Sequence, residues 1–155
     1  MSAPFHIRQD DLTDRRTLDL ISLHLAGMHA GSPPGTVFAL EATALRDASV
    51  TVWTAWSDDA IAGIAALKQL GEQHAEVKSM RTHPAFVRRG VASALLEHLI
   101  QEARRRRIIQ LSLETGCGAA FEPALALYRR RGFVEGGPFA DYRPNGHSVF
   151  LHLTL

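Results

Sequence analysis

The amino-acid sequence predicts a mixed α/β fold in which helices flank one mostly antiparallel sheet. Segments with apolar residues at helical spacing alternate with short segments rich in β-branched and aromatic residues. The turn Ser57-Asp58-Asp59 separates two of the strand-like segments, which is typical of an antiparallel hairpin. The chain has 155 residues, of which 46% are hydrophobic, so we expect one core and a single domain over residues 1–155.

The first half of the chain has the predicted element order β-α-α-β-β. The first helix is indicated by Leu18, Ile21 and Leu25, which recur at helical spacing, and the Gly/Pro-rich segment 31–35 follows it. The first strand of the hairpin is indicated by alternation and by residues with high β propensity. We expect, in order, a strand over 5–8, helices over 13–29 and 37–45, and strands over 50–56 and 61–70.

The second half has the predicted order β-α-β-α-β-β. Pro84 ends the first of these strands, and Val91 and Leu95 then begin an apolar stripe with helical period. Pro123 suits the first turn of the last helix, and Gly132 suits the position just past its end. We expect a strand over 75–82, a helix from 90 to about 106, a strand over 108–114, a helix over 125–131, and strands over 133–134 and 148–155.

Composition argues against several classes of function. The net charge of +1 is not that of a protein that coats a polyanion, so we expect no nucleic-acid partner, although arginines fill positions 104–107. No apolar stretch is long enough to span a bilayer, and we expect no membrane partner. The single cysteine, Cys117, excludes an internal disulfide and fits a cytoplasmic location. The histidines show no ligand spacing, so we expect no metal.

The turn before the helix that starts at Gly90 is the strongest candidate for a binding site. Gly90 lets the backbone approach a ligand closely, and the first N–H groups of the helix have no partner within it. These groups and the helix dipole favour an anion, and Arg88 and Arg89 add charged donors. Ala92 and Ser93 are small enough to leave room. The alternative is an ordinary helix start with solvated arginines.

Two separated motifs carry a family resemblance. The first is the run EVKSMRTHPAFVRRGVASALL over residues 76–96, and the second is ALYRRRGF over residues 126–133. Together they resemble the signatures of the GNAT superfamily of N-acetyltransferases, and the element order resembles that fold over about residues 5–155. Within the superfamily, the chain looks most like small bacterial acetyltransferases that carry a Ser-Pro-Pro loop, a Lys-Ser-Met-Arg-Thr strand and a Leu-Glu-Thr-Gly turn.

This resemblance implies acetyl-CoA as the co-substrate, with its pyrophosphate held at the turn. In the family, main-chain groups on the preceding strand pair with the pantetheine arm. The family turn usually begins with Gln or Arg, whereas Val87 stands there in this chain, so we expect the grip to depend on backbone N–H groups and the two arginines. The implied cofactor-binding residues are Met80, Thr82, Arg88, Arg89, Gly90, Val91, Ala92 and Ser93.

Acetyl transfer to an amine requires a group that takes a proton from the amine and one that gives a proton to the leaving thiolate. Tyr128 matches the tyrosine that the family often uses as general acid; the alternative is a core tyrosine with its hydroxyl satisfied. For the general base we expect Glu76, acting directly or through water, with Glu114 as the second choice. Glu76 and Lys78 share a strand face and could instead pair with their neighbours.

The resemblance implies a small-molecule amine as acceptor. In the family, the region between the two early helices lines the acceptor pocket, which makes Met28, His29 and Ser32 candidate contacts, and Arg81 could bind an acidic group of an amino-acid-like acceptor. The alternative function is a non-catalytic acetyl-CoA sensor that regulates a partner, to which Val87 gives some weight. The apolar last strand could pair at an edge and form a homodimer.

Overall fold

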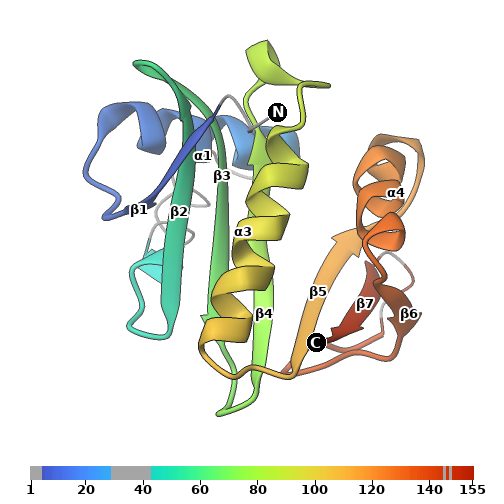
Figure 1. Ribbon diagram of the computed structural model, residues 1–155. Helices are drawn as coiled ribbons and strands as arrows, with labels where there is room; N and C mark the ends of the chain where they lie inside the picture. Colours follow the sequence, from blue (N-terminus) through green and yellow to red (C-terminus); the bar gives the residue numbers. More distant parts are fainter. Residues whose placement is uncertain (1–4, 29–42, 145, 147) are drawn as a thin grey trace. The chain divides into compact units, whose positions relative to one another are not determined.

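The computed structural model describes residues 5–28, 43–144, 146 and 148–155. Within these residues, the strands form a seven-stranded sheet in the order β1-β2-β3-β4-β5-β7-β6 (Figure 1). The strands are β1 (His6–Asp10), β2 (Val50–Ser57), β3 (Ala60–Gln69), β4 (His74–Thr82), β5 (Gln110–Gly116), β6 (Val134–Gly136) and β7 (Ser148–Thr154). The helices are α1 (Arg15–Met28), α3 (Val91–Arg105) and α4 (Glu122–Arg130), with short 3₁₀ helices η1 (Pro84–Phe86) and η2 (Ala119–Phe121).

The predicted fold class, a mixed and mostly antiparallel sheet flanked by helices, is confirmed. β4 and β5 pair in parallel, whereas β1–β2, β5–β7 and β6–β7 are antiparallel. Contacts divide the chain into two compact units. The N-terminal unit comprises the chain up to Leu67 together with Ser79–Leu99, and the C-terminal unit comprises Lys68–Lys78 and Ile100–Leu155.

Strand β2 separates two apolar layers in the N-terminal unit. Val52 and Trp56 belong to a buried cluster that includes Ile21 of α1. Trp53 contacts the ring of His98 in α3, with 5.3 Å between the ring centroids. Because successive strand residues point to opposite faces, α1 and α3 cover opposite faces of this part of the sheet (Figure 1).

The close approach of α3 to the sheet depends on Gly63 in β3. A Cβ atom at this position would lie 2.7 Å from Cγ1 of Val91, 2.9 Å from Cδ1 of Leu95 and 3.0 Å from the carbonyl oxygen of Arg81. These separations are too short for a side chain, so the helix can lie this close only over a glycine. Val91 and Leu95 are buried, which fixes the first turns of α3 on the strands.

The register of the C-terminal unit puts polar side chains on one face of its strands. Glu76 of β4 is opposite Ser112 of β5, and Ser112 is opposite His152 of β7. These three residues therefore share a face. The residues that alternate with them on β5 and β7 point to the other face and are buried: Leu111, Leu113, Leu151 and Leu153.

Two boundaries differ from the prediction because local caps decide them. β5 starts at Gln110 rather than 108, since a turn follows α3 up to Arg107, whose φ is +62°, and the N–H of Ile108 donates to the carbonyl of Ala103. Such a turn keeps Ile108 under the helix end instead of in the strand. α4 starts at Glu122 rather than 125, because Pro123 lies in its first turn.

Two further sequence predictions concern the helix over 37–45 and the edge of the last strand. The predicted helix over 37–45 lies mostly outside the described residues, and 43–45 are helical. The expectation that the last strand offers a free edge is wrong, because β7 pairs with β5 on one side and with β6 on the other. β6 covers the outer side of β7 at Phe150, Leu151 and His152, and β6 is the last strand in the order.

Candidate functional site

The turn that precedes α3 has the backbone geometry of a helix start. Arg88 has a φ of +63° and Gly90 a φ of +83°, so the chain turns sharply there. The carbonyl of Gly90 accepts the first helical bond, from the N–H of Ala94 at 3.0 Å. The N–H groups of residues 91–93 therefore precede the first bond of the helical ladder. A Cβ atom on Gly90 would meet nothing within 4 Å, which leaves open space at this turn.

The arginine side chains of this turn are exposed, and one of them lies over an aromatic ring that follows strand β4. Arg88 and Arg89 are exposed, and the Arg89 guanidinium lies 5.4 Å from the centroid of the Phe86 ring. The 3₁₀ turn η1 separates β4 from the arginines, and β4 ends at Thr82, just before Pro84. His83 caps this turn, since its Nδ1 accepts from the N–H of Ala85 at 3.0 Å.

Val87 is 53% exposed, so the position that usually carries a longer polar side chain in the family reaches solvent here. The residues predicted to pair with the pantetheine arm, Met80 and Thr82, lie in β4 and are half-buried. Just before them, Ser79 has a φ of +56°, which interrupts the extended backbone of the strand as in a bulge. Arg81 is half-buried, and its Nε has no hydrogen-bond partner among the described residues.

Glu76 is a buried carboxylate in the C-terminal unit, with only 4% of its surface exposed. The hydroxyl of Tyr142 donates to its Oε2 at 2.6 Å. The ammonium of Lys78 lies 3.9 Å from the same oxygen. A buried carboxylate is costly unless donors compensate for lost water, and these two groups supply that compensation. Glu76 thus pairs with its strand neighbour, as one of the sequence alternatives held, but its closest contact comes from a residue that the sequence did not identify.

Tyr142 belongs to the loop between β6 and β7, and the aromatic ring of Phe139 anchors this loop. Phe139 is buried, and its ring centroid lies 5.0 Å from that of Tyr142 and 6.1 Å from that of Phe150. It also lies 6.1 Å from the ring of His74 and 5.8 Å from that of His152. The loop is therefore packed against the polar face of the C-terminal strands.

Tyr128 lies in α4, within the C-terminal unit, and is 5% exposed. Its ring meets that of Phe133 edge-on, with 5.6 Å between the centroids. Burial raises the pKa of Tyr128 well above the ordinary value for a phenol, so the hydroxyl stays protonated at neutral pH. The described contacts of Tyr128 and of Glu76 have no residue in common.

A chain of hydrogen bonds crosses the polar face beside Glu76. His74 Nε2 lies 2.7 Å from the Ser112 hydroxyl, and that hydroxyl lies 2.8 Å from His152 Nδ1. On its other side, His152 Nε2 lies 2.8 Å from the carbonyl oxygen of Gly137. Burial, and then the charge of His152, lowers the pKa of His74. The second candidate base, Glu114, accepts a hydrogen bond from the Ser148 hydroxyl.

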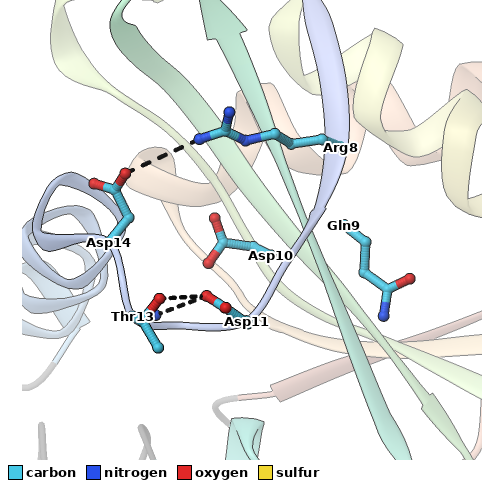
Figure 2. A pocket seen from close by; sticks show the side chains of 6 residues that line it. All are labelled: Arg8, Gln9, Asp10, Asp11, Thr13 and Asp14. Atoms are coloured by element: carbon cyan, nitrogen blue, oxygen red, sulfur yellow. Dashed lines mark hydrogen bonds and ion pairs between the residues drawn. The ribbon is translucent and has the colours of Figure 1, made fainter.

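An acidic hollow of about 500 Å³ lies at the junction of β1 and α1, and it holds none of the predicted site residues. Figure 2 shows Arg8 reaching toward Asp14, and Thr13 next to Asp11. The pKa of Asp14 falls to about 2, because Arg16 donates to its carboxylate. The carboxylates of this hollow are used by the fold, since Asp11 accepts from Thr13 within the turn and Asp10 accepts from Thr17 and from Thr54 of β2.

Some predicted residues lie outside these sites. Met28 is the last residue of α1, and His29 and Ser32 lie outside the described residues. Among the residues that the structure describes, no group of three or more His, Cys, Asp or Glu could hold a metal ion, and Cys117 is exposed. In the arginine run, Arg105 and Arg106 form ion pairs with Glu102, as at a solvated helix end. No helix in the described part is both long and apolar enough to cross a membrane.

Comparison with known proteins gives consistent matches. The model of the Acetyltransferase (GNAT) family matches residues 17–133. The uncharacterized N-acetyltransferase YedL of Escherichia coli (strain K12) is 48% identical over 97% of this chain and 95% of its own length. The uncharacterized N-acetyltransferase YsnE of Bacillus subtilis (strain 168) is 47% identical over 97% of this chain and 99% of its own. A crystal structure of a putative acyl-CoA N-acyltransferase from Klebsiella pneumoniae superposes with a TM-score of 0.80 at 26% identity, covering 99% of both chains.

Proposed function

The chain belongs to the Acetyltransferase (GNAT) family, and we propose that it transfers the acetyl group of acetyl-CoA directly to a primary amine of a small molecule. The start of α3 carries this proposal. Its backbone N–H groups, the open space at Gly90 and the exposed Arg88 and Arg89 fit a pyrophosphate. The proposed cofactor-binding residues are Met80, Thr82, Arg88, Arg89, Gly90, Val91, Ala92 and Ser93.

Two residues of the C-terminal unit are proposed for the proton transfers. When bound, acetyl-CoA supplies a thioester whose C–S bond breaks as the C–N bond to the amine forms. Glu76 accepts the proton that the amine loses, directly or through one water. Tyr128 gives its proton to the departing thiolate, the role in which it matches the family motif. Both side chains then return to their starting states by exchange with solvent.

For the acceptor, we propose that Arg81 binds an acidic group, since its buried Nε has no partner among the described residues. Met28, His29 and Ser32 complete the proposed acceptor contacts. The whole chain, residues 1–155, acts in this proposal as one domain in the cytoplasm, without a metal. Support comes from relatives named N-acetyltransferases that match 97% of the chain.

The test is a screen for free thiol release. Purified protein is incubated with acetyl-CoA and a panel of alkyl amines, polyamines, amino acids and short peptides with free N-termini, and acetyl-CoA alone is the blank. We expect amine-dependent release of CoA and an acetylated product of matching mass. Saturable acetyl-CoA binding without release for any amine would instead support the sensor.

Tyr128→Phe tests the acid within the same assay. We expect a fall in kcat of about 100-fold, as for loss of a general acid, with KM for acetyl-CoA changed by less than about threefold. Phenylalanine keeps the ring that meets Phe133, so thermal unfolding checks that packing is retained. Unchanged turnover would remove Tyr128 from the mechanism.

A further inference from the structure

We infer that Tyr142 is a positioning residue for the general base, and that the loop between β6 and β7 carries it into place. This inference rests on the proposed function, because it assigns Tyr142 a role through Glu76. Nothing in the local sequence around Tyr142 marks it, since its partner lies 66 positions away. The contacts of the loop and the burial of Glu76 carry the inference.

The first step is the hydrogen bond itself. The Tyr142 hydroxyl donates to Oε2 of Glu76 at 2.6 Å, a separation typical of strong bonds to a charged acceptor. Lys78 approaches the same oxygen at 3.9 Å. Both contacts therefore engage Oε2 and fix the orientation of the carboxylate. They do so at a side chain with little access to water.

The second step is the anchoring of the loop. Its beginning is tied down where the carbonyl of Gly137 accepts from His152 Nε2 at 2.8 Å. Phe139 then inserts among four rings, and the N–H of Tyr142 donates to the carbonyl of Phe139 at 3.0 Å. Because the backbone is bonded and the ring beside it is buried, the Tyr142 hydroxyl has a fixed place at Glu76.

The third step is the charge environment, which decides how activity depends on pH. Among the residues that the structure describes, four titratable or charged groups share this face with Glu76: His74 and Lys78 on β4, Glu114 on β5 and His152 on β7. On the loop, Asp141 and Arg143 flank Tyr142, which is itself titratable. Burial lowers the pKa of His74, so this histidine is a second group on this face that can affect the pH profile. A kinetic effect that belongs to Glu76 must therefore vanish when Glu76 is replaced, whereas an effect of His74 would remain.

The experiment is a double-mutant cycle with Tyr142→Phe and Glu76→Gln, using acetyl-CoA and the panel amine that gives the fastest thiol release. Tyr142→Phe keeps the ring against Phe139 and removes only the hydroxyl. We expect kcat to fall about tenfold, the loss of one bond to a charged group, with KM for acetyl-CoA within about twofold. The acid limb of the pH–rate profile should move to higher pH, because the charged form loses a donor.

In the Glu76→Gln background, Tyr142→Phe should have no further effect on kcat, because the hydroxyl acts through the carboxylate. Ser148→Ala is the matched control, since it removes a hydroxyl bonded to a different carboxylate, Glu114, on the same face. It should leave the acid limb in place. A readout without substrates is chemical unfolding of the same four proteins of the cycle, in which the two substitutions should be non-additive.

The outcomes separate the inference from the proposed function. If the wild type releases no thiol with any amine, the proposed function fails and the positioning role fails with it. If the wild type is active but Tyr142→Phe keeps its turnover and acid limb, only the positioning role is overturned. Equal effects of Tyr142→Phe in the wild type and in Glu76→Gln would also overturn it, because the tyrosine would then act independently of the carboxylate.

Discussion

At the scale of single residues, Gly63 decides how closely α3 approaches the sheet. We predict that Gly63→Ala destabilises the protein by about 1–3 kcal/mol, because the added methyl overlaps buried Val91 and Leu95. Gly71→Ala is the control, since a Cβ there meets nothing within 4 Å. Urea unfolding measures both. Equal stabilities of the two variants would show that the helix can shift without cost.

Tyr142 and Tyr128 show what the sequence could identify at this scale. Tyr128 can be identified from the sequence because it lies in a short motif, ALYRRRGF, whose neighbouring residues are informative. Tyr142 acquires its role only from Glu76, 66 positions away, and from Phe139, which orders its loop. Local patterns cannot encode such a contact, because it is created by the pairing of β4 with β5 and of β5 with β7.

At the scale of elements, a hydrogen-bond network joins β1, β2 and α1. Asp10 Oδ2 accepts from Thr17 at 2.9 Å and from Thr54 at 3.0 Å, and the Thr54 hydroxyl accepts from the indole of Trp56 at 2.7 Å. Both threonines are fully buried. These buried hydrogen bonds join β1, β2 and α1 at the point where the three elements meet.

We predict that Thr54→Val destabilises the protein by about 1–3 kcal/mol, because it keeps the shape but leaves buried polar partners without their bonds. Exposed Thr154 in β7 provides the control, and Thr154→Val should change stability by less than about 0.5 kcal/mol. Thermal unfolding compares the two. A Thr54→Val protein as stable as the wild type would show that packing alone joins these elements.

The elements that the sequence predicted well are those in which one period runs through the whole segment. β2, β3 and α3 differ from the predicted bounds by at most one residue at each end, because their apolar residues face a core at a fixed repeat. β5 and α4 differ by more, since the turn at Arg107 and the proline at 123 set their starts. Such caps depend on backbone geometry that hydrophobic periodicity does not report.

At the scale of the whole molecule, stability should fall with rising pH in the alkaline range, in part through Tyr128. Burial raises its pKa in the folded state, whereas the unfolded chain has the ordinary value of about 10. Its contribution is therefore complete below about pH 10 and is lost as the pH rises above that value.

We predict that unfolding free energies measured by urea between pH 8 and pH 11 decline more steeply for the wild type than for Tyr128→Phe. The variant has no phenol at this position, so it lacks this proton linkage while retaining the same fold. Parallel declines would mean that the hydroxyl ionises in the folded protein as readily as in the unfolded chain.

The sequence predicts the fold and the class of reaction, but it does not identify the acceptor. The family and the acyl-transfer class are established by motifs that match over most of the chain. The acceptor does not follow in the same way, because a shared fold serves many substrates and the acceptor contacts are made by side chains rather than by the common backbone.

The bonds among His74, Ser112 and His152 fix where each hydrogen atom sits. His152 Nε2 faces a carbonyl and carries the hydrogen there; in the neutral ring its Nδ1 then has a lone pair, to which Ser112 donates. His74 Nε2 is then left as the donor to the same hydroxyl. The Ser112 hydroxyl, which is fully buried, thus uses its one hydrogen toward His152 and accepts from His74. All three hydrogen bonds therefore point the same way, from His74 through Ser112 and His152 to the carbonyl of Gly137. This carbonyl, at the start of the loop that holds Tyr142, sets the tautomers of both histidines.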